Sequence, residues 1–573
     1  MTAFISSGYR GIGDSNFIPE LDYNNTFQYN GDVTKILGSH NLKFGADLRR
    51  RQINFASSNQ PRGNFSFDAN FTNDPTGLTP GSGNSIASLL IGYPSATTQN
   101  VLLIGPGLRT WEFGGFAQDD WRITRRLTVN VGVRYDVFTP FTEVRGRLAN
   151  ADLQTGTMLI PGQNGVSNTG NLKTDWKQFA PRFGFAFSLT PRTVIRGGYG
   201  ISYFPSNFGA NSQLFRNPPY VSLYTVATTT LNPVNRVSDG FPVAAPVNPA
   251  SPIGSIIADS FDLRPSYAQQ YNLTIQREFA GFVATAAYVG VLTRHMTVDY
   301  AADIGYPGPG PIAPRRPYYQ QFPNVSGITL ENSDAISNYH AMQLSLEHRF
   351  ARGLTAQSSY TFGHSIDDGQ PIGGGKPGSG PFPQLVNNRA LERASSDIDI
   401  RQRFVAMINY ELPFAKGAHG VAGALMKGWI VNGILVAQTG VPFTVTNATA
   451  RDNTGGGGRP NRLASGVLAS DQRTIRRWFD TSAFAPQPLY TIGNSGRNIL
   501  YGPPLRQIDF SVFKQFKPTE RFTIEFRAES FNLTNTPNFG IPAAALGAAT
   551  FGTISDTGNS QARQLQFALK LLF

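Results

Sequence analysis

The sequence predicts an all-β protein, a transmembrane antiparallel β-barrel of roughly sixteen strands. Three observations support this fold. Apolar residues recur at every second position, which is the signal of a β-strand. Many of these segments run for about ten residues or more, the length that a tilted strand needs to cross a bilayer. Short turns also alternate with long loops along the chain, as they do in barrels of the bacterial outer membrane.

The alternation is clearest in the segment LTVNVGVRYDV, whose apolar side consists of Leu127, Val129, Val131, Val133, Tyr135 and Val137. Asn130 lies on the opposite side. In another strand that opposite side carries full charges, at Glu525, Arg527 and Glu529. A soluble sandwich could expose such a side to water, whereas a membrane barrel places it in the lumen and turns the apolar side to lipid. Barrel closure would satisfy the backbone N–H and C=O groups that lipid cannot.

Tight turns join the strands in pairs, at ILGSHN, ITRRL, LTPRT, FARGL and FKPTERF. Long connections rich in Pro, Gly, Asn and Ser separate the pairs: 141–178, 205–266, 296–336, 366–399, 441–504 and 534–562. We therefore expect short periplasmic turns and long extracellular loops, with residues 1–20 irregular. Residues 421–440 form the most apolar stretch, but Lys427, Asn432 and several glycines interrupt it, so no membrane helix is predicted.

The composition narrows the classes of partner. The 573 residues carry a net charge of +12, which fits a solvated surface, nucleic acid or an anionic lipid surface, and charge alone does not choose among them. Because the basic residues are scattered rather than grouped, nucleic acid is disfavoured. Because there is no cysteine, disulfides and thiolate metal sites are excluded. The N-terminal segment MTAFISSGYRGIGDSN lacks a basic region followed by an apolar one, so we expect no signal peptide in this sequence.

The chain ends on a patterned strand, QLQFALKLLF. We expect this strand to run inward from the outer side and to place its last aromatic residue in the girdle at the inner interface. The alternative is an ordinary edge strand of a soluble protein. A terminal aromatic residue preceded by alternating apolar residues also resembles the sorting signal that the barrel assembly machinery reads. The candidate signal residues are Leu565, Phe567, Leu569, Leu571 and Phe573.

Several motifs together resemble a known family. FGGFAQDDWRITRRLTVNVGVRYDVF is similar to a strand pair of TonB-dependent outer-membrane receptors. The segments DIRQRFVAMINYELPF, KGWIVNGILVAQTGVPFTV, WFDTSAFAPQP, GNSGRNILYGP, AESFNLTNTPNFG and RQLQFALKLLF follow in the order seen in the Oar-like branch, whose members often carry a carboxypeptidase-regulatory-like domain. The resemblance runs from about residue 20 to the end of the chain. Each motif is short, and it is their joint order that makes the resemblance specific.

The resemblance implies a barrel in the cell outer membrane that contacts lipid and lipopolysaccharide. In the intact family a plug fills the barrel, and a TonB-type energy-coupling protein drives uptake or sensing of a large substrate. Nothing in residues 1–573 resembles the plug, the regulatory-like domain or a signal peptide. We therefore expect the C-terminal part of such a barrel, an incomplete fragment whose sheet is left open or closed imperfectly.

Two other classes of function stay open. The chain could form a passive outer-membrane pore or a surface adhesin, and a plug-coding region directly upstream in the DNA would argue against both. It could also be a soluble β-rich binding protein, which would need no detergent.

No enzyme chemistry, cofactor site or metal site is predicted. The stretch IGGGKPGSG around Lys376 departs from a phosphate-binding loop, and residues 453–461 are expected to be loop. None of the six histidines shows zinc-enzyme spacing, although His348 and His364 lie on neighbouring strands and could meet. Asp397 and Asp399 are expected on one strand face without a calcium loop. The lumen charges are expected to pair across strands, or in the intact family to face the plug: Arg134, Arg182, Arg401, Arg403, Arg527, Glu525 and Glu529. No motif identifies substrate-contacting residues.

Overall fold

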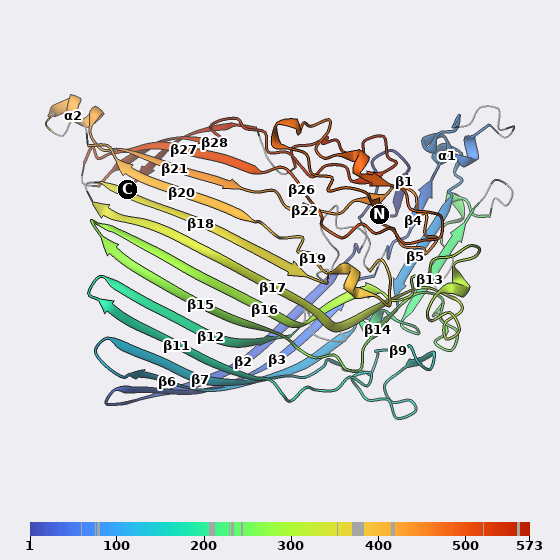
Figure 1. Ribbon diagram of the computed structural model, residues 1–573. Helices are drawn as coiled ribbons and strands as arrows, with labels where there is room; N and C mark the ends of the chain where they lie inside the picture. Colours follow the sequence, from blue (N-terminus) through green and yellow to red (C-terminus); the bar gives the residue numbers. More distant parts are fainter. Residues whose placement is uncertain are drawn as a thin grey trace.

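The computed structural model describes residues 1–573 except 16, 59, 75, 77–80, 206–212, 229, 231–233, 242–244, 352, 370–382, 414–416, 418, 520 and 559–561. Its main feature is a sheet of eighteen strands curved into an incomplete barrel (Figure 1). Three of the eighteen, β8, β14 and β19, are short additions in the loop region, which leaves fifteen strands in the barrel wall.

The wall strands follow one another in chain order, and each pairs with its neighbours in an antiparallel manner. They are β2 (Leu21–Leu37), β3 (His40–Ala56), β6 (Gly107–Arg122), β7 (Leu127–Phe138), β11 (Phe179–Thr190), β12 (Thr193–Phe204), β15 (Ser266–Phe279), β16 (Phe282–Ala301), β17 (Val325–Ala351), β18 (Leu354–Asp367), β20 (Gln402–Glu411), β21 (Trp429–Gln438), β27 (Leu505–Phe516), β28 (Thr523–Phe531) and β30 (Gln564–Leu572). The all-β antiparallel prediction is confirmed, with fifteen wall strands where roughly sixteen were expected.

The remaining strands lie at the loop end of the wall. They are β8 (Thr142–Glu143), β14 (Gly254–Asp259) and β19 (Ala394–Ser395), the sheet of β1 (Ala3–Ser6), β4 (Asn64–Phe67), β5 (Ala96–Leu102) and β13 (Val221–Ala227), and the pairs β9 (Asn150–Asp152) with β10 (Thr157–Leu159), β22 (Pro442–Phe443) with β26 (Leu500–Tyr501), β23 (Thr446–Asn447) with β29 (Ala545–Leu546), and β24 (Asn461–Arg462) with β25 (Phe484–Ala485). The expectation that residues 1–20 are irregular is wrong for Ala3–Ser6, because β1 pairs in parallel with β4.

Short turns gather at one end of the wall and long loops at the other, as predicted (Figure 1). One turn-end connection departs from this rule. Between β20 and β21 the chain takes seventeen residues, 412–428, and forms the helix α2 (Gly420–Met426). The other α-helix, α1 (Ser85–Ile91), lies at the loop end. No helix in the described ranges is long and apolar enough to cross a membrane, and the apolar stretch 421–440 divides into α2 and β21.

Part of the predicted loop 296–336 is strand. β16 continues to Ala301 and β17 begins at Val325, and β14 adds a parallel strand beside β17. These extensions pack their side chains into a cluster of buried apolar residues that includes Val298, Phe322 and Ile328. The Pro- and Gly-rich segment between them, 302–324, obscured the period-two signal on either side of it.

The apolar cores of the protein lie among the loops rather than inside the wall. One cluster contains Leu108, Phe141, Leu148, Leu214 and Phe215, and another contains Phe443, Phe479, Phe484 and Leu500. This distribution follows from the strand pattern, because the wall turns its apolar side outward to lipid and keeps no apolar face for its interior. The long loops therefore fold as a compact cap on one end of the wall.

The sheet does not close. Among the described residues β2 pairs with β3 alone and β30 with β28 alone, and every residue of β2 is exposed. Fifteen strands in strict antiparallel alternation also leave the two edges pointing the same way, since β2 and β30 both run from the loop end to the turn end. The prediction of an open barrel is confirmed. The strand near residues 25–35 exists as β2, but it does not pair with the last strand.

Candidate lumen and loop cap

The two faces of the wall have opposite character. Val131 pairs with Phe183, which pairs with Tyr199, and all three side chains are exposed on the outer face. Their neighbour Asn130 points the other way and donates a hydrogen bond to the Asp120 carboxylate. The facing predicted for this strand is therefore confirmed.

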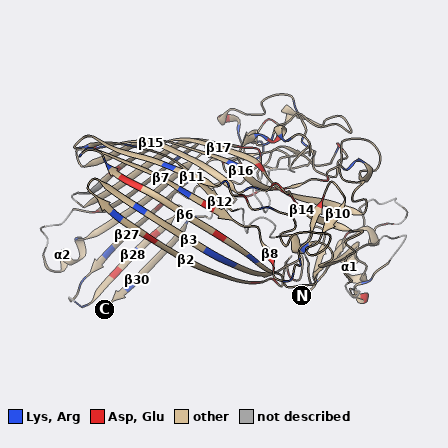
Figure 2. Ribbon diagram, turned by 90° about the horizontal axis from the view of Figure 1, so that it is seen from below, with Lys and Arg blue, Asp and Glu red and all other residues tan. Residues whose placement is uncertain are grey.

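The concave face of β2, β3, β6, β7, β11 and β12 carries a cluster of charged and polar residues around a cavity of about 480 Å³. Figure 2 shows both basic and acidic residues along β2, β3 and β6. The charged residues that line the cavity are Asp47, Arg49, Arg51, Glu112, Arg134, Asp136 and Arg182. Four arginines and three carboxylates give this part of the lumen a positive balance, which favours anionic or strongly polar molecules.

Ion pairs hold most of these side chains. Glu112 is only 8% exposed and accepts a hydrogen bond from Arg51 at 3.1 Å, while Arg49 lies 3.6 Å away. Arg134 donates to Asp136 on its own strand at 2.8 Å and to Asp47 at 2.7 Å. Because Asp47 belongs to β3 and Arg134 to β7, this last bond spans the whole width of β6.

Gly114 makes that span possible. It lies on β6 directly between Asp47 and Asp136 in register. A Cβ atom built at Gly114 would overlap the Arg134 Nη2 and Asp47 Oδ1 atoms at distances that real Cβ contacts do not reach. The absence of a side chain thus opens a path across the middle strand, the use of strand glycine where another group approaches closely.

The predicted pairing of lumen charges across strands is confirmed only in part. Arg134 reaches across to Asp47, but Arg527 pairs with Glu525 two residues away on the same strand. Arg401 pairs with Asp399 at 3.0 Å in the loop region. The described residues show no ion pair for Arg182, Arg403 or Glu529. Arg182 instead lies between Gly132 and Gly200 on the flanking strands and faces the cavity.

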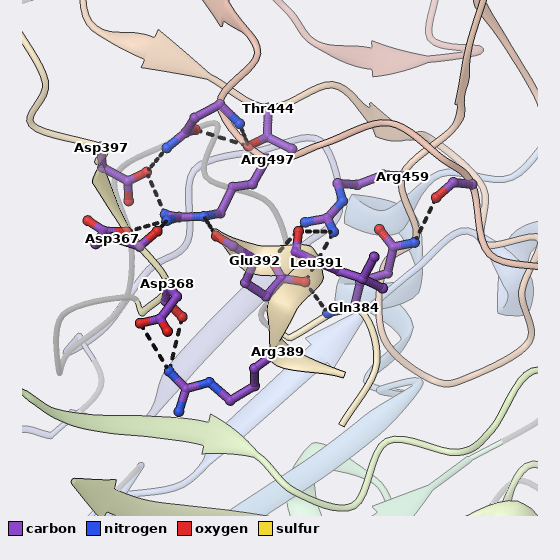
Figure 3. Close-up of polar contacts among 12 residues, drawn as sticks. Asp367, Asp368, Gln384, Arg389, Leu391, Glu392, Asp397, Thr444, Arg459 and Arg497 are labelled. Carbon is purple, nitrogen blue, oxygen red and sulfur yellow. Dashed lines mark hydrogen bonds and ion pairs between the residues drawn. The ribbon is translucent and has the colours of Figure 1, made fainter. Parts of the chain in front are cut away.

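Above the wall, buried ion pairs lock three segments of the loop cap together (Figure 3). Arg459 forms a two-pronged contact with Glu392, at 2.8 and 3.1 Å, and both side chains are at most 2% exposed. Arg497 donates to the Asp367 carboxylate and, through Nε, to the Glu392 carbonyl at 3.0 Å. Figure 3 shows these arginines converging on the short segment around Glu392, a 3₁₀-helix over Arg389–Glu392.

Sequence reasoning missed this cluster. Arg459 stands in the glycine-rich stretch 453–461, which was expected to be loop and is loop as far as Pro460, where β24 follows. Its partner Glu392 lies 67 residues away. The stretch around Lys376 falls in 370–382, outside the described residues. No pattern in the sequence marks Arg459, between Gly458 and Pro460, as buried.

The expected positions of two aspartates need correction. Asp397 and Asp399 lie in a turn rather than on a strand face, since β19 ends at Ser395. Asp397 lies 3.5 Å from Arg497, and Asp399 accepts hydrogen bonds from Tyr501 at 3.0 Å and the Ser365 amide at 2.8 Å.

His348 and His364 lie on the neighbouring strands β17 and β18, as expected, but they do not meet. The ring of His348 packs on Phe282 near the turn end, whereas His364 contacts Asp399 at the loop end. Within the described part of the chain no three His, Asp or Glu side chains gather as metal ligands would.

A buried carboxylate pins the loop that follows β7. Glu143 accepts hydrogen bonds from the amides of Gly107, Arg145 and Arg147, at 3.0, 2.7 and 2.9 Å. Burial alone would raise the pKa of Glu143. The Arg147 guanidinium and these three amides outweigh burial and hold the pKa of Glu143 below its ordinary value. The ionised carboxylate therefore fixes this loop to the start of β6.

The candidate assembly residues form one outward row. Leu565, Phe567, Leu569 and Leu571 are 54–75% exposed and pair with Ser530, Ala528, Phe526 and Ile524 of β28. Phe573 follows the last strand residue at the turn end and is 86% exposed.

An outward apolar face, a charged concave face, short turns at one end and long loops at the other define a β-barrel wall of the outer membrane. The chain belongs to the outer membrane beta barrel domain family, whose sequence model matches residues 1–566. The protein is accordingly located in the outer membrane, with its short turns in the periplasm and its long loops outside the cell. A search of curated protein sequences finds no match.

Several solved structures resemble this chain at low identity. They include the outer membrane transporter YddB from Escherichia coli (12% identity, TM-score 0.49), the pyoverdine receptor FpvA from Pseudomonas aeruginosa bound to pyoverdine (11%, 0.46) and a mutant of the ferric enterobactin receptor PfeA from the same species in complex with enterobactin (12%, 0.47). Each match covers 96% of this chain and 53–54% of the solved chain. The chain thus spans about half the length of these proteins.

Proposed function

We propose that this chain forms part of the barrel of a TonB-dependent receptor or transporter of the Oar-like branch, which takes up or senses a large substrate. The width of the wall carries the proposal. Fifteen strands are almost enough for a porin of about sixteen strands, yet the two edges do not meet. An open seam after fifteen strands leaves room for further strands, as in a wider barrel of about 22 strands, which is the size of plugged transporters.

The directions of the two edge strands determine how many strands would be needed to close this barrel. β2 and β30 run in the same direction, so antiparallel pairing at both seams requires an added sheet whose two outer strands both run from the turn end to the loop end. Only an odd number of strands meets that condition. In the proposal, these strands, a plug and a regulatory-like domain are encoded ahead of residues 1–573, and a TonB-type protein drives the complete receptor.

The lumen and the motifs add support. The charged concave face around Arg134 and Arg182 suits contact with a plug or with a polar substrate. The motifs from FGGFAQDDWRITRRL to RQLQFALKLLF occur in the order seen in that branch. The proposed protein is a receptor or transporter and not an enzyme.

Permeability separates this proposal from a passive pore. We would express residues 1–573 behind an export signal, and separately the longest continuous reading frame that contains them, and measure entry of vancomycin, which an intact outer membrane excludes. The short chain is expected to admit vancomycin or to be degraded, and to show no uptake driven by the proton-motive force. The long frame is expected to be closed. A long frame that lacks a plug region and admits vancomycin as freely as the short chain would establish the passive pore instead.

We also propose that Leu565, Phe567, Leu569, Leu571 and Phe573 are the signal for assembly by the barrel assembly machinery. Replacing Phe573 by Asp should remove most of the heat-modifiable, membrane-assembled form, because the terminal aromatic residue is the proposed contact. Leu572→Asp, one residue earlier and on the opposite face of β30, is the matched control. Equal assembly of the two variants would contradict the signal.

A further inference from the structure

The outer face of β3 and β6 carries two arginines near the loop end of the wall. Arg50 pairs in register with Trp111, and Arg109 pairs with Gln52. Because Arg50 and Gln52 are two positions apart on one strand, the two arginines are diagonal neighbours on the same face of the sheet. That face is the outer one, since the residues on either side of Arg50 line the lumen cavity.

Trp111 marks the outer boundary of the lipid-facing band. A second tryptophan of β6, Trp121, lies ten positions nearer the turn end and stacks on His40, with the ring centroids 5.1 Å apart. Ten residues of a strand tilted by about 40° span about 25 Å along the membrane normal, which is the height of the apolar band in outer-membrane barrels. The two tryptophans therefore lie in the two aromatic girdles, with Trp111 in the girdle on the outer side.

The outer face changes from apolar to polar at this level. The cross-strand row just below Arg50, toward the turn end, consists of Tyr29, Leu48 and Phe113. The row of Arg50 itself is completed by Phe27 and Trp111. The next row toward the loops consists of Asn25, Gln52, Arg109 and Thr142. A lipid on this face therefore meets apolar and aromatic side chains along its acyl chains, and two cations beside amide and hydroxyl groups at its headgroup.

The two arginines have no carboxylate partner among the described residues. The guanidinium carbon of Arg50 lies 4.7 Å from the centre of the Trp111 ring. Arg109 donates through Nη1 to the Asn54 side chain at 3.1 Å and to the Leu108 carbonyl at 2.8 Å. Its Nε and Nη2 atoms have no hydrogen-bond acceptor in the described part of the chain. Two neighbouring cations without a counter-charge at a membrane interface favour a bound anion.

We propose that Arg50 and Arg109 bind the phosphate of a phosphorylated glycolipid in the outer leaflet. The phosphate lies between the two guanidinium groups, each of which can offer it a fork of N–H donors. The sugar packs against the Trp111 ring, and the acyl chains follow Leu48 and Phe113 toward the bilayer centre. All of these side chains share the outer face, so a free phosphate satisfies only the charged part of the site.

The test uses the full chain, folded in detergent and titrated with bis-phosphorylated lipid A while bound lipid is followed by native mass spectrometry. The double variant Arg50→Gln/Arg109→Gln is expected to weaken the tightest binding about fivefold for each arginine removed. Arg125→Gln/Arg126→Gln removes two exposed cations from the β6–β7 turn at the periplasmic end and is expected to leave that binding unchanged. Equal weakening by the two double variants would overturn the proposal.

A conservative variant guards against misfolding as an explanation. Arg50→Lys/Arg109→Lys keeps both charges and is expected to recover most of the binding that the glutamine pair loses, although lysine lacks the forked donors. A loss as complete as that of the glutamine pair would contradict the role of charge. Displacement of lipid A by millimolar inorganic phosphate would overturn the proposal, because the site would then recognise no attached lipid. Equal binding of phosphatidylglycerol would also overturn it, because the site would then recognise no sugar.

Discussion

Replacing Arg459 by glutamine is expected to lower the free energy of unfolding of the loop cap by about 3–5 kcal/mol. The change leaves the Glu392 carboxylate, which is fully buried, without its cationic partner, and it removes two hydrogen bonds of 2.8 and 3.1 Å. Glutamine is too short to restore both. The measurement is hydrogen exchange of loop amides in the detergent-folded protein, which reports local opening of the cap separately from the wall.

Arg477 supplies the matched control in the same loop. Its ion pair with Asp480 is exposed, at 57% and 30% for the two side chains, so Arg477→Gln should cost less than about 1 kcal/mol. The double variant Arg459→Met/Glu392→Leu should recover much of the loss, because an apolar pair can replace a buried ion pair. If Arg459→Gln and Arg477→Gln cost the same, the buried pair does not stabilise the cap.

Arginine at position 131 is expected to destabilise the wall by about 2–4 kcal/mol if that residue lies near the bilayer midplane. Val131 is 53% exposed on the lipid-facing side, next to Phe183, and a guanidinium there has no water and no counter-ion. The cost would appear as a shift of the denaturant midpoint for folding into lipid vesicles.

Asn130→Arg is the control, one residue away. Its side chain points into the lumen and contacts Asp120, so a cation gains a carboxylate partner there and the cost should be small. Equal penalties at positions 130 and 131 would mean that the two faces are assigned wrongly or that the strand is not in lipid.

The local pattern was enough to predict most of the wall. The alternation in LTVNVGVRYDV gives β7 its bounds and its facing, and the short turns mark where the strands reverse. The extension of β17 outward to Val325 could not be predicted, because in that part the strand is supported by contacts with the separate segment β14.

The contacts of the charged site join residues that are far apart in the chain, and the sequence alone does not show which of them meet. The bond from Arg134 to Asp47 joins residues 87 positions apart and needs Gly114 between them, so its three members come from three strands. Arg459 and Glu392 are separated by 67 residues and meet in irregular structure. The period of the apolar residues and the local composition carry information about residues that are close in the chain. The members of these two pairs are far apart in the chain, so neither pair could be predicted. The aspartates expected on a strand, Asp397 and Asp399, lie instead in the turn that presents them to Arg497 and Tyr501.

The direction of the two free edges also bears on self-association. Two copies in one bilayer share an axis perpendicular to the membrane plane, so both keep their loops outside the cell. Under that symmetry β2 of one copy meets β30 of the other running the same way, and only parallel ladders can form at the seams. Antiparallel seams between two copies would require one of them to be inverted, with its loop cap facing the periplasm. A two-fold symmetric dimer, the commonest form among soluble homo-oligomers, would therefore not close this wall into an antiparallel barrel.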